Sequence, residues 1–143
     1  MRIIEKADAD FVCLQEVTDE TRETIMLSDV VKNKYLKNGG SATANLFLIP
    51  YGCIMLSKYK CLFYEKYFMS RMGRTLLLAE APLPVNLIVA TSHYESLGFS
   101  QKERKDQMEQ TFKLLKQAQG ENYVCHSVVV GDFNFNSTKK AEE

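Results

Sequence analysis

Three short apolar segments of this chain each end abruptly in polar side chains, and this pattern constrains the fold more than any other feature. The segments and the residues that close them are 11–14 with Gln15 and Glu16, 87–90 with Ser92 and His93, and 128–130 with Asp132 and Asn134. Continuous apolar runs of this length are typical of buried strands in an α/β sheet. Functional side chains gather where such strands end. The pattern therefore predicts an α/β fold with one shared site. For any single segment, the alternative is that the polar residues simply mark the end of a strand.

The rest of the chain predicts further helices and strands around these three segments. Thr18 and Ser100 are typical helix N-caps, and Gly120 is a typical helix stop. Helices are expected over residues 1–7, from 19 onward with the apolar stripe Ile25, Met26 and Val30, and over 101–119 with the stripe Met108, Phe112 and Leu115. Further strands are expected over residues 46–49, 52–57, 61–64 and 76–79, with a loop at 37–41 and a turn at 82–84.

Composition excludes several classes of protein. The length of 143 residues fits one domain or part of one, and a hydrophobic fraction of 45% can fill a core. Lys and Arg total 18 and so do Asp and Glu, so no overall positive charge draws the chain to nucleic acid, although a local basic groove remains open. No apolar run reaches the roughly 18 residues that span a bilayer, so we expect no membrane partner, and no signal peptide is expected.

The four cysteines are scattered and form no metal-binding pair. They are Cys13, Cys53, Cys61 and Cys125. Because each lies in or beside an apolar run, we expect buried free thiols rather than a zinc cluster or a disulfide framework. Free thiols are typical of a reducing compartment, either the nucleus or the cytoplasm.

The polar residues that close the three segments can together perform one kind of chemistry. Glu16 offers a hard oxygen ligand to Mg²⁺, which prefers one or two carboxylates together with water and phosphate oxygens. Asp132 can orient or deprotonate an attacking water, and Asn134 can hold that water or a phosphate oxygen. His93 can donate a hydrogen bond to an oxyanion on phosphorus. These groups favour metal-assisted hydrolysis of a phosphodiester.

Two of the motifs resemble signatures of a known superfamily. Residues 14–17 (L-Q-E-V) and 131–134 (G-D-F-N) resemble motifs of the endonuclease/exonuclease/phosphatase superfamily, which has the DNase I-like fold. Residues 91–96 (T-S-H-Y-E-S) resemble the corresponding segment of the tyrosyl-DNA phosphodiesterase 2 family. The resemblance implies a four-layer αββα sandwich with mixed, mainly antiparallel sheets. It also implies a Mg²⁺-dependent hydrolase, with Mn²⁺ as a substitute, that acts as a monomer.

The same resemblance implies a substrate and a set of residue roles. The substrate is DNA with a 5′-tyrosyl or peptide adduct left by topoisomerase II, and the process is DNA repair in the nucleus, the cytoplasm or both. The implied roles are a metal ligand for Glu16, positioning of water and phosphate for Asp132 and Asn134, contact with phosphate or DNA for His93 and Ser96, a basic group beside the groove for Arg74, and DNA contact for Tyr51.

The sequence also departs from the family pattern. Gly98 stands where the family often has an arginine after the E-S segment. Residues 135–136 (F-N) stand where the family has a second arginine, shortly after the G-D-x-N motif. The family's first Asn-bearing strand and its late S-D-H motif have no counterpart. We therefore expect residues 1–143 to form a partial domain, incomplete at both ends, with little activity in isolation.

Two other functions remain open at this stage. One is a different member of the superfamily, such as an endonuclease, a deadenylase, a sphingomyelinase or an inositol phosphatase. The other is a truncated product that binds a partner without catalysis. For the individual residues, the alternatives are turn formation by Asp132 and Asn134, a core position for His93, and ordinary surface positions for Glu16, Arg74 and Ser96.

Overall fold

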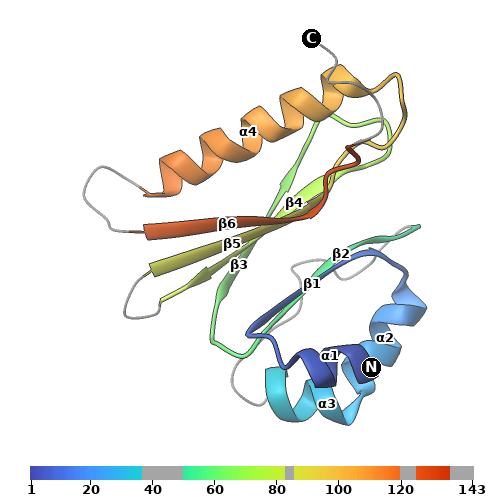
Figure 1. The fold of residues 1–143 in the computed structure, drawn as a ribbon, viewed down its shortest axis with the longest axis vertical. Coiled ribbons are helices and arrows are strands. Elements are labelled where there is room, and N and C mark those ends of the chain that lie inside the picture. The colour runs from blue at the N-terminus through green and yellow to red at the C-terminus, as the bar shows by residue number, and fades with distance from the viewer. Residues whose placement is uncertain (37–49, 83–85, 120–124, 136–143) are drawn as a thin grey trace.

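The computed structural model describes residues 1–36, 50–82, 86–119 and 125–135 (Figure 1). Its helices are α1 (Arg2–Ala7), α2 (Asp19–Leu27), α3 (Asp29–Val31), the π-helical turn η1 (Lys32–Leu36) and α4 (Gln101–Gln119). Its strands are β1 (Phe11–Val17), β2 (Gly52–Ser57), β3 (Leu62–Tyr67), β4 (Thr75–Ala81), β5 (Asn86–His93) and β6 (Cys125–Asp132). The loop at 37–41, the strand at 46–49, most of the turn at 82–84 and the stop at Gly120 lie outside the described residues.

The strands form two sheets. β1 pairs antiparallel with β2, and a second sheet has the order β3-β4-β5-β6. In this second sheet β3, β4 and β5 are antiparallel neighbours, whereas β5 and β6 run parallel. The connection from β5 to β6 includes α4, as a parallel pair requires a long crossover. The mixed, mainly antiparallel arrangement confirms the predicted fold class.

Three separate hydrophobic cores divide the structure into four layers. The first core joins α2, α3 and η1 to the β1-β2 sheet, and it includes Ile25, Tyr35 and Ile54. The second lies between the two sheets and includes Met55 and Leu77. The third joins the β3-β6 sheet to α4. Figure 1 shows the same order, with α1–α3 on the outer face of β1-β2 and α4 across the outer face of β3–β6. The αββα sandwich is therefore confirmed.

Strand alternation explains how each sheet serves two cores. In β5, Ile88 and Ala90 belong to the core under α4, while Val89 belongs to the core between the sheets. Successive side chains of a strand point to opposite faces, so a strand that is covered on both faces is apolar throughout. The same alternation carries Thr91 and His93 to the face of β5 that looks toward the β1-β2 sheet.

Several sequence expectations need correction. β1 does not end at residue 14 but continues to Val17, so Glu16 lies within the strand. β6 is only half-buried, and Val128 is 46% exposed, because β6 is the outermost strand of its sheet among the described residues. Phe112, expected in the apolar stripe of α4, points largely to solvent. Ser100, expected to cap α4 with its side chain, accepts the Arg104 N–H with its backbone carbonyl, while its hydroxyl makes no hydrogen bond with a described residue.

The cysteines are free, as expected, but each is only partly buried. Burial nevertheless raises the pKa of both Cys13 and Cys53 to about 11, so these two thiols remain protonated at neutral pH. In the part of the chain that the structure describes, no helix has the length and apolar character needed to cross a membrane.

Candidate functional site

The parallel pairing of β5 and β6 brings two of the predicted site residues side by side. His93 is the last residue of β5, Asp132 is the last residue of β6, and the two are direct register partners. The carboxyl ends of parallel strands meet at the same edge of a sheet, which is where ligand sites of α/β sheets lie. The His93 Nε2 atom lies 3.7 Å from Asp132 Oδ2, which is longer than a direct hydrogen bond.

A β-bulge in β1 turns Glu16 toward this edge. Between the pairs Leu14–Ile54 and Val17–Gly52, β1 has two residues and β2 has one. The extra residue shifts the alternation of side chains between the two faces of β1, so Val17 joins the core on the helix side. Glu16 itself adopts a left-handed φ of 55°. Bulges commonly re-aim a side chain next to a site. Here the Glu16 carboxylate, on the other sheet, comes within 3.8 Å of His93 Nδ1.

Arg74 fixes the protonation state of His93. The guanidinium Nη1 lies 3.0 Å from His93 Nδ1. Since arginine can only donate, Nδ1 must accept, and the ring proton is therefore on Nε2, which faces Asp132. Burial and the Arg74 charge lower the pKa of His93 below its usual 6.5, and the weaker attraction of Asp132 and Glu16 opposes them. His93 is thus a neutral donor at neutral pH.

The other contacts of Arg74 complete this side of the site. Its Nη2 lies 3.5 Å from Ser96 Oγ and 3.6 Å from the sulfur of Met72, and Ser96 itself donates to that sulfur at 3.3 Å. The guanidinium carbon lies 5.8 Å from the centre of the Tyr51 ring, within the range of a cation–π contact. Sequence reasoning missed Met72, because a lone methionine in a loop carries no chemical signal.

A close approach of two backbones holds the end of β6 in place. Gly131 has a φ of 142°, and a Cβ there would lie 2.1 Å from the carbonyl oxygen of Ser92. The amide Nδ2 of Asn134 donates to the Tyr94 carbonyl at 2.8 Å, and the Asn134 N–H donates to Asp132 Oδ1 at 2.9 Å. Asn134 also has a left-handed φ of 53°, which asparagine tolerates better than most residues. One amide proton and the side-chain oxygen of Asn134 remain for a ligand.

The structure thus brings all seven predicted site residues together. The side chains of Glu16, Tyr51, Arg74, His93, Ser96 and Asp132 are linked through Arg74 and His93. Asn134 joins them through its backbone N–H, which donates to Asp132. A small cavity of about 20 Å³ lies among Glu16, Arg74, His93 and their neighbours, which is the space of about one water molecule. The remaining lining includes Cys53 and Gly73, which sequence reasoning did not select.

Within the described ranges, no group of three or more His, Cys, Asp and Glu side chains is arranged as a complete metal cage. The donor chemistry still fits Mg²⁺, because that ion is usually held by one or two carboxylates, with water and substrate oxygens filling its other positions. The Glu16 side chain is 65% exposed and the Asp132 side chain is 52% exposed, so each carboxylate retains lone pairs that protein donors do not use. Glu16 is the residue that would hold the ion.

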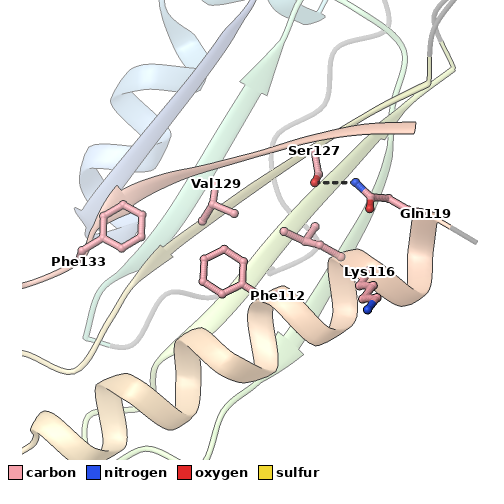
Figure 2. A pocket seen from close by; sticks show the side chains of 7 residues that line it. Phe112, Lys116, Gln119, Ser127, Val129 and Phe133 are labelled. Atoms are coloured by element: carbon pink, nitrogen blue, oxygen red, sulfur yellow. Dashed lines mark hydrogen bonds between the residues drawn. The ribbon is translucent and has the colours of Figure 1, made fainter. Parts of the chain in front are cut away.

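A larger hollow lies elsewhere and does not carry the chemistry. A groove of about 590 Å³ lies between α4 and β6. Figure 2 shows its lining side chains and the hydrogen bond that Gln119 donates to the hydroxyl of Ser127. Its walls are mostly apolar, and its only charged group is Lys116. It opens on the α4 face of the sheet, opposite the face to which His93 and Asp132 point. This groove is the larger of the two hollows, but His93, whose pKa is lowered, and the carboxylates lie at the smaller cavity. Because shifted pKa values are typical of functional sites, the smaller cavity is the candidate site.

Comparison with known families agrees with this geometry. Residues 1–139 match the model of the endonuclease/exonuclease/phosphatase family. The chain belongs to this family. Members of the family are hydrolytic enzymes that generally use divalent metals. A search of curated proteins gave no match.

Solved structures of this superfamily share the fold. A truncated TDP2 from Caenorhabditis elegans aligns with a TM-score of 0.78 at 19% identity, over 94% of this chain and 53% of that one. ANGEL2, described as a 2′,3′-cyclic phosphatase, aligns with a TM-score of 0.74 at 19% identity, over 96% and 43%. The human Nocturnin catalytic domain aligns with a TM-score of 0.71 at 16% identity, over 96% and 56%. This chain spans about half the length of these proteins.

Proposed function

We propose that this chain carries one wall of the active site of a phosphodiesterase that hydrolyses the 5′-phosphotyrosyl bond between DNA and a topoisomerase II remnant. The observation that supports this most directly is the meeting of Glu16, His93 and Asp132, from three different strands, around a histidine that is held neutral. The T-S-H-Y-E-S segment favours this substrate over others of the superfamily. A D. rerio TDP2 has been solved with a single-strand DNA product, and it shares the fold.

In the proposed reaction each residue has a distinct role. Asp132 accepts a proton from the attacking water, because its carboxylate is half-exposed and lies at the edge of the sheet. The water oxygen forms the new bond to phosphorus while the bond from phosphorus to the tyrosine oxygen breaks, and the tyrosine departs as a phenolate that takes a proton from solvent water. The Nε2–H of His93 donates to a phosphate oxygen as negative charge develops there. A bound Mg²⁺ or Mn²⁺ would supply Lewis-acid stabilisation of the phosphate.

Arg74 and Ser96 bind the substrate phosphate or the departing oxygen on the other side of His93. Asn134 keeps one amide proton for the water or a phosphate oxygen. Tyr51 lies over the guanidinium, lines the cavity and contacts DNA in this proposal. We infer that the protein acts as a monomer in DNA repair, in the nucleus or the cytoplasm.

The test is a substrate panel with the native protein, in the presence and absence of Mg²⁺ and Mn²⁺. The panel contains 5′-tyrosyl DNA, abasic DNA, poly(A) and phospholipid head groups, and the Asp132→Asn variant serves as the inactive control. Release of tyrosine that needs the cation and is lost in the variant supports the proposal. Failure on tyrosyl DNA together with turnover of another substrate would overturn the assignment of the substrate while keeping the hydrolase.

The alternative within the superfamily has specific support, because ANGEL2 and Nocturnin resemble the fold nearly as closely as TDP2 does. A 2′,3′-cyclic phosphate therefore belongs in the same panel. The mass of the native protein is measured alongside, since a product of 16.4 kDa with no turnover of any substrate would favour the non-catalytic binding product.

A further inference from the structure

A buried carboxylate, Glu95, lies directly behind the site and touches none of the proposed reacting groups. Glu95 has no exposed surface, and burying a carboxylate is costly unless hydrogen bonds compensate it. Its Oε2 atom accepts hydrogen bonds from the hydroxyl of Ser70 at 2.7 Å and from the amide of Gln107 at 3.2 Å. Its Oε1 atom makes no hydrogen bond with a described residue. A cost of this kind, immediately next to a candidate site, calls for a functional reason.

Ser70 connects this carboxylate to Arg74. While its hydroxyl proton is donated to Glu95, its oxygen accepts the backbone N–H of Arg74 at 2.9 Å and that of Met72 at 3.1 Å. The hydroxyl rotor is therefore oriented by Glu95, so that its lone pairs face the two backbone donors. The turn that presents Arg74 to His93 is folded around one hydroxyl group, and that hydroxyl is held by one carboxylate.

The same residue anchors the opposite side of the site to α4. The backbone N–H of Glu95 donates to Gln107 Oε1 at 3.1 Å, so main chain and side chain both bind one glutamine. Arg104 donates to the Glu95 carbonyl at 3.0 Å and to the Leu97 carbonyl at 2.8 Å. Ser96, which lies between these carbonyls, is thereby fixed relative to the helix.

We propose that Glu95 is a positioning residue of the phosphodiesterase site, which sets the place of Arg74 through Ser70 and of Ser96 through α4. The inference rests on the proposed function. Because Arg74 touches His93 Nδ1, a shift of the turn displaces both the guanidinium and the histidine ring that it orients. Misplacement of such groups by about 1 Å costs on the order of 10²-fold in rate.

The first experiment needs no activity. Backbone amide exchange is measured by NMR for Arg74 and Met72 in the wild type and in Glu95→Ala, Glu95→Gln and Ser70→Ala variants. Glu95→Ala and Ser70→Ala are expected to raise the exchange rate of both amides by about 10-fold or more, since the acceptor is disordered or removed. Glu95→Gln should restore the slow exchange, because its amide oxygen still accepts from Ser70.

The matched control is Thr111→Val on the same helix. Thr111 is fully buried and bonds the hydroxyl of Tyr94 at 3.1 Å, so its loss destabilises the helix packing without touching Ser70. The inference is overturned if Thr111→Val raises the exchange of the Arg74 amide as much as Glu95→Ala does, or if Glu95→Ala leaves that exchange unchanged. Should Glu95→Ala fail to fold, Ser70→Ala decides the same question.

The second experiment is a double-mutant cycle on turnover in the native protein. Glu95→Ala is expected to lower the rate about 10- to 100-fold in the wild type but less than about 3-fold in an Arg74→Ala background, because the group that it positions is gone. Multiplicative effects would overturn the inference. A wild type that hydrolyses no phosphodiester would refute the proposed function, and amide exchange would still decide whether Glu95 positions Arg74.

Discussion

The two halves of the candidate site differ in their access to water. Arg74 is 5% exposed and the His93 side chain 7%, and both are held by hydrogen bonds from neighbouring loops. Glu16 and Asp132, by contrast, present more than half of each side chain to solvent. The buried half is fixed in geometry and protonation before any substrate arrives. The exposed half keeps its oxygens available for a cation and for water, as the proposed hydrolysis requires.

The comparison predicts the largest effect for the exposed carboxylate at the end of β6. Replacing Asp132 with asparagine keeps an oxygen that can accept the Asn134 N–H, so the end of the strand should keep its structure. The proposed general base is lost, and we expect turnover of the native protein to fall about 10²- to 10⁴-fold. Single-turnover hydrolysis of the preferred substrate gives the number. A loss below about 5-fold would show that another group accepts the proton from water.

The next effect is one of stability, at the place where β6 meets the strand that carries His93. In Gly131→Ala the new Cβ would overlap the Ser92 carbonyl, at a φ that other residues avoid. The free energy of unfolding should fall by about 2–4 kcal/mol, as measured by urea denaturation. Gly98→Ala is the matched control, because no heavy atom lies within 4 Å of its Cβ position, and it should change stability by less than about 0.5 kcal/mol. Equal effects at both glycines would contradict the close approach of β5 and β6.

The sequence was sufficient to predict the parts of this site that follow from regular strands. His93 and Asp132 were recognisable because each closes a strand that is apolar on both faces, and such strands lie side by side in an α/β sheet. The position of Glu16 was only half predictable. Its identity was clear, but regular alternation cannot reveal a bulge, which depends on how β1 pairs with β2.

The buried half was the harder part to predict. An arginine is usually exposed, and nothing in residues 70–74 indicates that Arg74 is buried against a histidine. The same is true of the link from Glu95 to Ser70, because these residues are 25 positions apart and meet only after β4 and β5 have paired. Local patterns predict elements, whereas the orientation of a hydroxyl or a guanidinium is set by tertiary contacts.

The buried half should also respond to pH. The pKa of His93 is lower in the folded protein than in the unfolded chain. Between these two pKa values the unfolded chain binds more protons than the folded protein, so the free energy of unfolding rises with pH. The stability is fully present above the ordinary value of 6.5 and is lost as pH falls from there toward the folded pKa. Chemical denaturation between pH 7 and pH 5, in a chelator, should show this loss.

The control for the pH effect is His93→Gln, whose side-chain oxygen can still accept from Arg74. This variant should lose the part of the slope that lies just below pH 6.5 and keep the slope due to carboxylates at lower pH. A slope that survives His93→Gln would assign the titration to another group.

The smallest effect is expected at Glu16, and it separates binding from folding. Without metal, Glu16→Gln should change the free energy of unfolding by less than about 0.5 kcal/mol, because the side chain is largely solvated. With Mg²⁺ or Mn²⁺ at ten times its dissociation constant, the wild type should gain about 1.4 kcal/mol and the variant should gain none. Glu109→Gln is a suitable control, since its carboxylate is equally exposed, at 65%, on the outer face of α4. If both variants keep the gain, the cation binds elsewhere; if only Glu16→Gln loses it, the exposed half of the site is the half that holds the metal.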